Sequence, residues 1–168
     1  MKRFQHNILK LVVLAIFFSS QNFALQATTL SQSTTVQTSA KVDQWLKQSG
    51  YKYTKAAETV WIIKSKGNAL SEFETFVAVN ENVVVIGVVM AKQKDLKMSE
   101  DVLFKLLKLN HDNDFVKIGI DGDNDLFVRL ERKVRTLDLE ELKSCYAEVV
   151  AASDNVYTQI KPFLITGK

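Results

Sequence analysis

The sequence of 168 residues contains one cysteine, one proline and two histidines. A single cysteine excludes an intramolecular disulfide framework and any zinc site built from four cysteines. Two histidines leave little material for acid–base or metal chemistry that depends on imidazole. The six glycines occur singly, so no glycine-rich loop is present to surround a phosphate group. These absences argue against an enzyme and against a bound cofactor or metal.

The first 27 residues have the pattern of a secretory signal peptide. Lys2, Arg3 and Lys10 give a basic start, and an apolar run of eight residues follows at 11–18. That run is well short of the roughly 20 residues needed to span a bilayer. We therefore expect a protein exported to the periplasm or secreted, with cleavage near Ala27 and no membrane span after cleavage. The alternative is an uncleaved N-terminal segment that anchors a structural or regulatory protein in the cell envelope.

The formal net charge of +3 comes from this leader, because residues 1–27 hold three basic residues and no acidic ones. Without the leader, the 22 basic residues fall to 19, which equals the 19 acidic residues. Nucleic acid binding requires a surplus of Lys and Arg on one face. The sequence therefore predicts no nucleic acid partner.

Residues 28–40 carry no charge and consist mostly of Ser, Thr and Gln. Such a stretch buries too little apolar surface to offset the entropy lost on ordering, so it predicts a flexible linker. The body of the chain, residues 41–165, then forms one domain. At this size, a single domain buries about two thirds of its extended-chain surface.

Hydrophobic periodicity within the body predicts the element order α-β-β-β-α-β-β-α. Helices are expected over 41–49, from the capping residue Ser99 to about 109, and from Asp138 to Pro162. Strands are expected over 60–64, 73–79, 83–90, 115–120 and 126–130. This order predicts the α+β class, with an antiparallel sheet of about five strands and three helices packed on it.

The strand expected over 83–90 is apolar at both sets of alternating positions. A half-exposed antiparallel strand alternates with polar residues, so both of its faces should be covered. The cover is either the rest of the same chain or a second subunit. If it is a subunit or another protein, the interface candidates are residues of this strand and of the last helix: Val84, Ile86, Val88, Met90, Tyr146, Val150 and Tyr157.

Residues 115–142 read FVKIGIDGDNDLFVRLERKVRTLDLEEL. An apolar strand, a turn of Asp, Gly and Asn, a strand that begins Leu-Phe-Val-Arg and a Leu-Asp helix start follow one another. Together with the element order over 41–165, this segment resembles the YbjN-like, type III secretion chaperone-like domains. The matching positions are Phe115, Ile118, the turn 121–125, 126–129, Leu137, Asp138 and Leu142. The resemblance implies a small non-enzymatic α+β domain that often forms a homodimer and binds peptides or other proteins.

Three smaller features allow a chemical or a structural reading. The turn 121–125 resembles the first half of a calcium loop. Leu126 and Arg132, however, occupy the positions where that loop requires Gly and Glu. A hairpin turn explains the same residues. Cys145 lies at the edge of the apolar stripe of the last helix and is either a buried, inert thiol or one half of an intermolecular disulfide. His111 follows the second helix and is expected at the surface or as a helix cap. None of the three predicts a catalytic residue.

Overall fold

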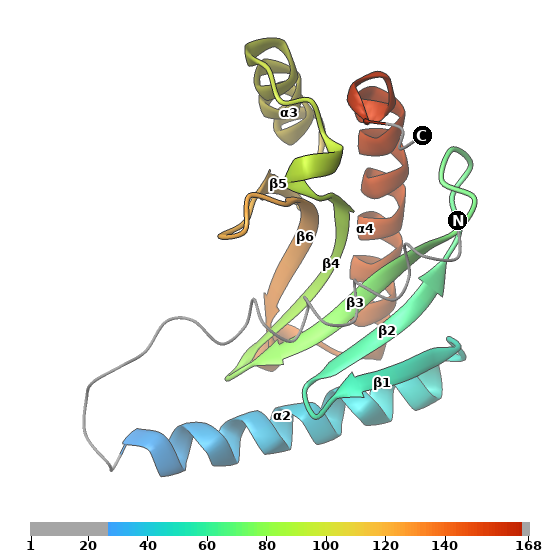
Figure 1. Ribbon diagram of the computed structural model, residues 1–168. Helices are drawn as coiled ribbons and strands as arrows, with labels where there is room; N and C mark the ends of the chain where they lie inside the picture. Colours follow the sequence, from blue (N-terminus) through green and yellow to red (C-terminus); the bar gives the residue numbers. More distant parts are fainter. Residues whose placement is uncertain (1–26, 166–168) are drawn as a thin grey trace.

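The computed structural model describes residues 27–165, and the side chains from residue 35 onward. In this range the chain forms three α-helices and one six-stranded sheet (Figure 1). The helices are α2 (Ala27–Ser49), α3 (Glu100–Asp112) and α4 (Leu139–Ile160). The strands are β1 (Tyr53–Ala57), β2 (Val60–Ser65), β3 (Phe73–Asn80), β4 (Val83–Ala91), β5 (Lys117–Ile120) and β6 (Leu126–Lys133).

The sheet is antiparallel throughout, with the strand order β1-β2-β3-β4-β6-β5. The predicted α+β class is confirmed, but the sheet has six strands rather than about five. The missed strand is β1, whose sequence Tyr-Thr-Lys-Ala-Ala ends in three residues that are depleted in strands. It is an edge strand that pairs only with β2, and that pairing holds it extended.

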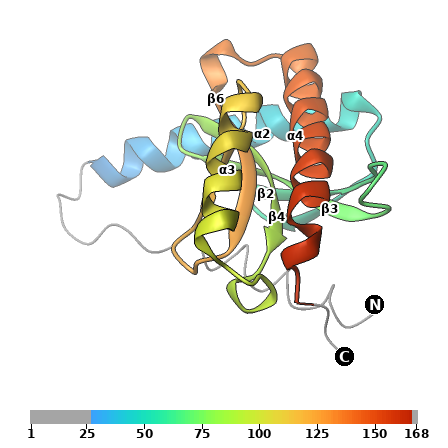
Figure 2. The same cartoon turned by 90° about the horizontal axis from the view of Figure 1, so that it is seen from above.

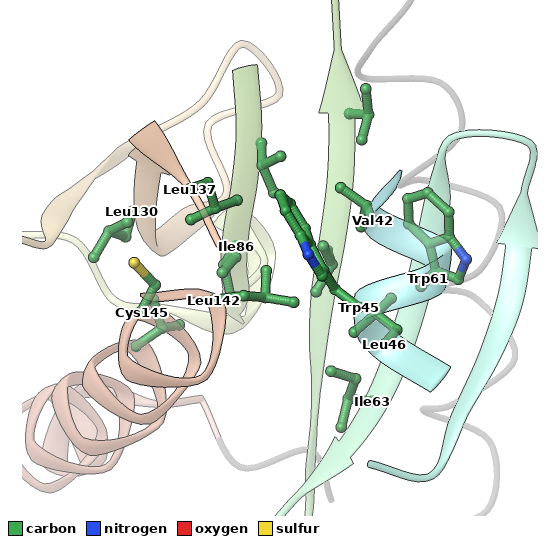
Figure 3. Close-up of a cluster of buried hydrophobic side chains, with 14 of the residues drawn as sticks. Val42, Trp45, Leu46, Trp61, Ile63, Ile86, Leu130, Leu137, Leu142 and Cys145 are labelled. Carbon is green, nitrogen blue, oxygen red and sulfur yellow. The ribbon is translucent and has the colours of Figure 1, made fainter. Parts of the chain in front are cut away.

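Helices α2 and α4 both pack on one face of the sheet and form its main core (Figure 3). Val42, Trp45 and Leu46 of α2 meet Trp61 and Ile63 of β2 in this core. Leu142, Cys145 and Val149 of α4 cover Ile86 of β4 and Leu130 of β6 in the same cluster. Helix α3 lies beside α4 over the β5–β6 end of the sheet, where Val102, Leu106 and Leu109 form a second cluster with α4, β5 and β6 (Figure 2).

Residues 28–40 are helical in the structure, so the prediction of a flexible linker there is wrong. The stretch 28–49 contains neither Gly nor Pro, and its last two turns are fixed by the burial of Val42, Trp45 and Leu46. Extending an existing helix costs far less than nucleating one, so even a polar segment continues it. The expected signal peptide lies outside the described residues, apart from Ala27, at which α2 begins.

The helix ends follow the local sequence signals. The Ser99 hydroxyl accepts a hydrogen bond from the Val102 backbone N–H at the start of α3. The Asp138 carboxylate accepts a hydrogen bond from the Glu141 backbone N–H at the start of α4. Helix α2 ends before Gly50, whose φ of 81° lies in the left-handed region that glycine tolerates best. Within residues 27–165, no helix combines the length and the apolar composition that crossing a bilayer requires.

Strand β4 has one buried face and one partly covered face. Val84, Ile86 and Val88 lie in the core on the face that α4 covers, where each is at most 2% exposed. The prediction that these residues form an interface is therefore wrong, because the chain's own helix occupies that face. Val83, Val85 and Val89 on the opposite face are half-buried. Of the two predicted alternatives, cover by the same chain is therefore correct for the face of β4 that carries Val84.

Candidate binding groove and helix surface

A groove of about 680 Å³ opens between α4 and the loop that joins β2 to β3. Two of the residues predicted as an interface, Tyr146 and Val150 of α4, line it. The other predicted interface residues lie elsewhere: Met90 packs half-buried between the two core clusters, and Tyr157 is half-buried farther along α4. The full lining is Tyr51, Lys66, Gly67, Asn68, Tyr146, Ala147, Val150, Ala151 and Asp154.

The aromatic wall of the groove is fixed by contacts on several sides. The rings of Tyr51 and Tyr146 lie 4.4 Å apart, centroid to centroid, and are tilted by 40°. The Tyr146 hydroxyl is 2.8 Å from the hydroxyl of Ser65, which in turn lies 2.7 Å from that of Thr75. Burial, with a smaller contribution from Tyr146, raises the pKa of Tyr51, so its phenol stays protonated. The wall is therefore held in place by ring packing and hydrogen bonds, and it contributes aromatic surface to the groove.

The opposite wall is the β2–β3 loop, which Asp154 holds against α4. The Asp154 carboxylate accepts hydrogen bonds from the backbone N–H groups of Asn68, Ala69 and Leu70 at 3.0, 2.9 and 2.8 Å. A side chain at Gly67 would overlap this carboxylate, so only glycine allows the loop to approach so closely. The hydrogen bond from Leu70, followed by those from Ala69 and Asn68, lowers the pKa of Asp154.

We expect the loop to detach from α4 in acid. A carboxyl group whose pKa is lowered by folding stabilises the fold above its ordinary pKa of 3.8, and this stabilisation is lost as the pH falls through the lowered value. The amide signals of Asn68, Ala69 and Leu70 should therefore shift together below pH 3.8 in NMR spectra. An Asp154→Ala variant should show the detached loop already at neutral pH, whereas Asn155→Ala, one position along α4, should resemble the wild type. Unchanged loop signals in Asp154→Ala would show that Asp154 does not hold the β2–β3 loop against α4.

A second feature is an apolar surface around α3, which sequence reasoning missed. Of the eight large hydrophobic side chains that are exposed in the described chain, six fall between residues 98 and 120. We call these six residues the α3 surface: Met98, Leu103, Phe104, Leu107, Phe115 and Ile120. Within α3, Val102, Leu106 and Leu109 are buried, whereas Leu103, Phe104 and Leu107 are exposed. The spacing in fact describes two stripes on opposite sides of one helix.

Helix α3 is fastened to the edge strand β5 by one side chain. The Asn110 amide donates to the Ile118 carbonyl oxygen at 2.8 Å and accepts from the Ile118 N–H at the same distance. These bonds supply partners to a strand that pairs only with β6. The helix and the sheet edge are therefore joined by these hydrogen bonds as well as by their packing in the second cluster. His111, one residue later, is exposed, as expected.

The remaining candidates have structural roles. Cys145 is buried, as predicted, and burial, followed by the nearby Glu141 carboxylate, raises its pKa to about 12, which disfavours the reactive thiolate. The turn 121–125 joins β5 and β6 as a hairpin, in which Asp121 Oδ1 accepts from the N–H groups of Asp123 and Asp125. Among the described residues, no three His, Cys, Asp or Glu side chains gather where a metal ion could bind.

No family model and no curated protein match the sequence. Solved structures do match the fold. One chain of the heterodimeric ExoU–SpcU complex from the type III secretion system of Pseudomonas aeruginosa has a TM-score of 0.53 and 17% identity, covering 72% of this chain and 98% of that one. YbjN from E. coli has a TM-score of 0.52 and 11% identity, covering 76% of this chain and 95% of YbjN. A chain of the ExsC–ExsE complex has a TM-score of 0.51 and 12% identity, covering 79% and 98%. The resemblance predicted from the sequence is thus confirmed at the level of the fold.

Proposed function

We propose that this chain is a non-enzymatic, chaperone-like module that binds a protein or peptide partner, works as a homodimer, and is exported to the periplasm or secreted. The groove between α4 and the β2–β3 loop carries the binding proposal. It presents tyrosine and aliphatic side chains on two walls that are already fixed before a ligand arrives, which lowers the entropy cost of binding. Two solved chains with this fold come from complexes with a second protein, which supports the same class of partner.

The groove suits one apolar or aromatic side chain of an extended segment. Tyr51 and Tyr146 offer ring surface, and Ala147, Val150 and Ala151 give a smooth aliphatic floor along α4. Buried aromatic contacts of this kind dominate the binding energy of many protein interfaces. Lys66 at the rim is exposed and adds one positive charge. The partner is therefore recognised by an exposed hydrophobic side chain, as an unfolded or unstructured polypeptide would present it.

A single charge in the groove tests this function. The probe is reduced and carboxymethylated α-lactalbumin, a permanently unfolded polypeptide, and binding is followed by fluorescence anisotropy. We expect Val150→Asp to weaken binding roughly tenfold or more, because it buries a carboxylate under the ligand. Asn155→Asp adds the same charge at an exposed position of α4 outside the groove lining and should bind as the wild type does. Equal binding by Val150→Asp and the wild type would refute the groove as the site.

Export rests on the pattern of residues 1–27 and is tested separately. Chain recovered from cells that express the whole sequence should be found in the periplasm or the medium, with a new N-terminus near Thr28. Cleavage there would leave nearly all of α2, which begins at Ala27, in the mature protein. Recovery of the intact N-terminus in the membrane fraction would instead favour an anchored envelope protein.

A further inference from the structure

We infer that one end of this fold binds the surface of an anionic lipid bilayer through exposed lysine side chains. These residues lie on the second half of α2, on β1 and on the loop between them, and we call them the lysine patch: Lys41, Lys47, Lys52 and Lys55. The lysine patch shares no residue with the groove, so its role is separate from the binding of a protein partner.

Charge is distributed unevenly along a chain that is neutral overall without its leader. Residues 41–66 contain six lysines and two acidic residues, whereas residues 67–168 contain 13 basic and 17 acidic residues. Residues 99–125, which include α3 and β5, carry seven acidic residues and three lysines. Because β1 and β5 are the two edges of the sheet, the basic and acidic ends lie on opposite sides of the fold (Figure 1). An anionic surface would therefore attract the β1 end and repel the β5 end.

Two lysines of the patch lie against buried tryptophans. Lys55 is opposite Trp61 in the sheet register, so its side chain lies on the face that α2 covers. The Nζ atom of Lys55 is 5.4 Å from the ring centroid of Trp61, and that of Lys41 is 4.8 Å from the ring centroid of Trp45. The aliphatic stems can therefore pack against the indoles while the ammonium groups stay in solvent beside α2.

Little negative charge offsets the lysine patch. Asp43 is the single acidic residue in the sequence of α2. Its carboxylate lies 2.7 Å from the Lys47 ammonium group and accepts a hydrogen bond from the Trp61 indole at 3.0 Å. Among the residues whose side chains the structure describes, no ion pair engages the other three lysines of the patch. Three ammonium groups therefore remain available to an anionic ligand.

The residue types fit a bilayer better than a nucleic acid or a single phosphate group. Residues 41–66 contain no arginine, whose planar fork binds one phosphate through two hydrogen bonds, whereas lysine acts as a flexible, hydrated point charge. Trp45 and Trp61 are buried, so neither ring can stack on a base. A group of exposed lysines is typical of reversible attraction to many anionic headgroups at once.

The place of α2 in the chain favours a bilayer over an acidic protein. Helix α2 begins at Ala27, and the apolar run of the leader ends at residue 18. The residues between them span at most about 30 Å when fully extended. A leader that is cleaved at the membrane or retained in it therefore leaves α2 beside the lipid. This proximity follows from the proposed export or anchoring, whereas the charge distribution is independent of both.

Co-sedimentation of the processed chain with lipid vesicles tests the inference. Vesicles of phosphatidylcholine with about 30% phosphatidylglycerol should bind the wild type at low salt and release it in about 0.5 M NaCl, because salt screens the attraction. Vesicles of phosphatidylcholine alone should not bind it. The triple variant Lys41→Gln, Lys47→Gln and Lys55→Gln should bind the anionic vesicles at least about tenfold more weakly.

A matched triple variant removes the same number of charges from exposed positions at the other end of the fold: Lys94→Gln, Lys97→Gln and Lys108→Gln. It should bind the anionic vesicles about as well as the wild type does, and circular dichroism should show that both variants are folded. A wild type that does not bind these vesicles, or equal losses in the two variants, would overturn the inference. Lysine-dependent binding to polyglutamate without binding to vesicles would assign the patch to an acidic protein and overturn it as well.

A paramagnetic lipid tests the orientation, both for the processed chain and for a chain that keeps its leader. Vesicles that contain a gadolinium-chelating lipid should broaden the amide signals of Lys47 and Lys52 most and those of α3 least. Strongest broadening at α3 would refute the orientation. An intact leader, seen by N-terminal sequencing, would contradict the proposed export alone, whereas a loss of lysine dependence would contradict the lysine patch alone.

Discussion

Replacing Trp61 by alanine is expected to lower the free energy of unfolding by about 3–5 kcal/mol, the usual cost of removing a large aromatic side chain from a packed core. Trp61 is 0% exposed and lies where α2 meets the sheet (Figure 3). Its indole Nε1 also donates to the Asp43 carboxylate of α2 at 3.0 Å. One side chain thus contributes both packing and a polar contact that joins α2 to β2.

Two variants separate these contributions. Trp61→Phe keeps an aromatic ring but loses the indole N–H, so we expect a smaller loss than for alanine. Asp43→Ala removes the hydrogen bond to the indole together with the surface ion pair to Lys47, and should cost about 0.5–1.5 kcal/mol. Urea unfolding followed by the fluorescence of Trp45, which all three variants retain, measures the free energies. If Trp61→Ala unfolds at the same urea concentration as Asp43→Ala, packing of the indole contributes nothing and the predicted core is wrong.

Local signals in the sequence predicted most elements because they act over a few residues. Ser99 and Asp138 accept backbone hydrogen bonds three residues ahead, and Gly50 adopts the left-handed conformation that ends α2. Both partners of each contact lie within a few residues of each other, so the contact can be predicted without the rest of the fold. The β5–β6 hairpin belongs to the same class, since the turn from Asp121 to Asp125 closes on itself.

Contacts between distant segments could not be predicted in the same way. Strand β1 is extended because β2 pairs with it, and the polar half of α2 is helical because the apolar half is anchored in the core. The sequence of neither segment shows which distant part of the chain it packs against. The prediction that β4 is covered on both faces likewise could not say that α4 covers Val84, Ile86 and Val88.

The candidate groove shows the same limit. Tyr146 and Val150 were predicted as interface residues because they lie on the stripe of the last helix. The opposite wall comes from a loop that Asp154 holds through hydrogen bonds spanning 84 to 86 positions of the chain. The α3 surface could not be predicted for another reason. Helix α3 has apolar residues on two sides, and the sequence alone does not show which side packs on the sheet and which stays exposed.

Replacing Asp125 by alanine is expected to lower the free energy of unfolding by about 2–4 kcal/mol. Asp125 is buried at the start of β6, where its carboxylate accepts from the Gln93 N–H at 2.9 Å and lies 3.5 Å from the Lys92 ammonium group. Removing it leaves a backbone donor and a largely buried cation without their partner. These contacts join the hairpin turn to the segment between β4 and α3.

Thermal and urea unfolding of three variants tests this structural role against the calcium reading of the same turn. Asp125→Asn still accepts the Gln93 hydrogen bond and should lose about 1 kcal/mol. Asp123→Ala changes an exposed residue of the turn and should lie within about 0.5 kcal/mol of the wild type. Because Asp121 and Asp125 already accept hydrogen bonds from the chain, added Ca²⁺ should leave the unfolding of the wild type unchanged. Stabilisation by Ca²⁺ that disappears in Asp123→Ala would show that the turn binds the ion, and the structural role argued for Asp125 would then be incomplete.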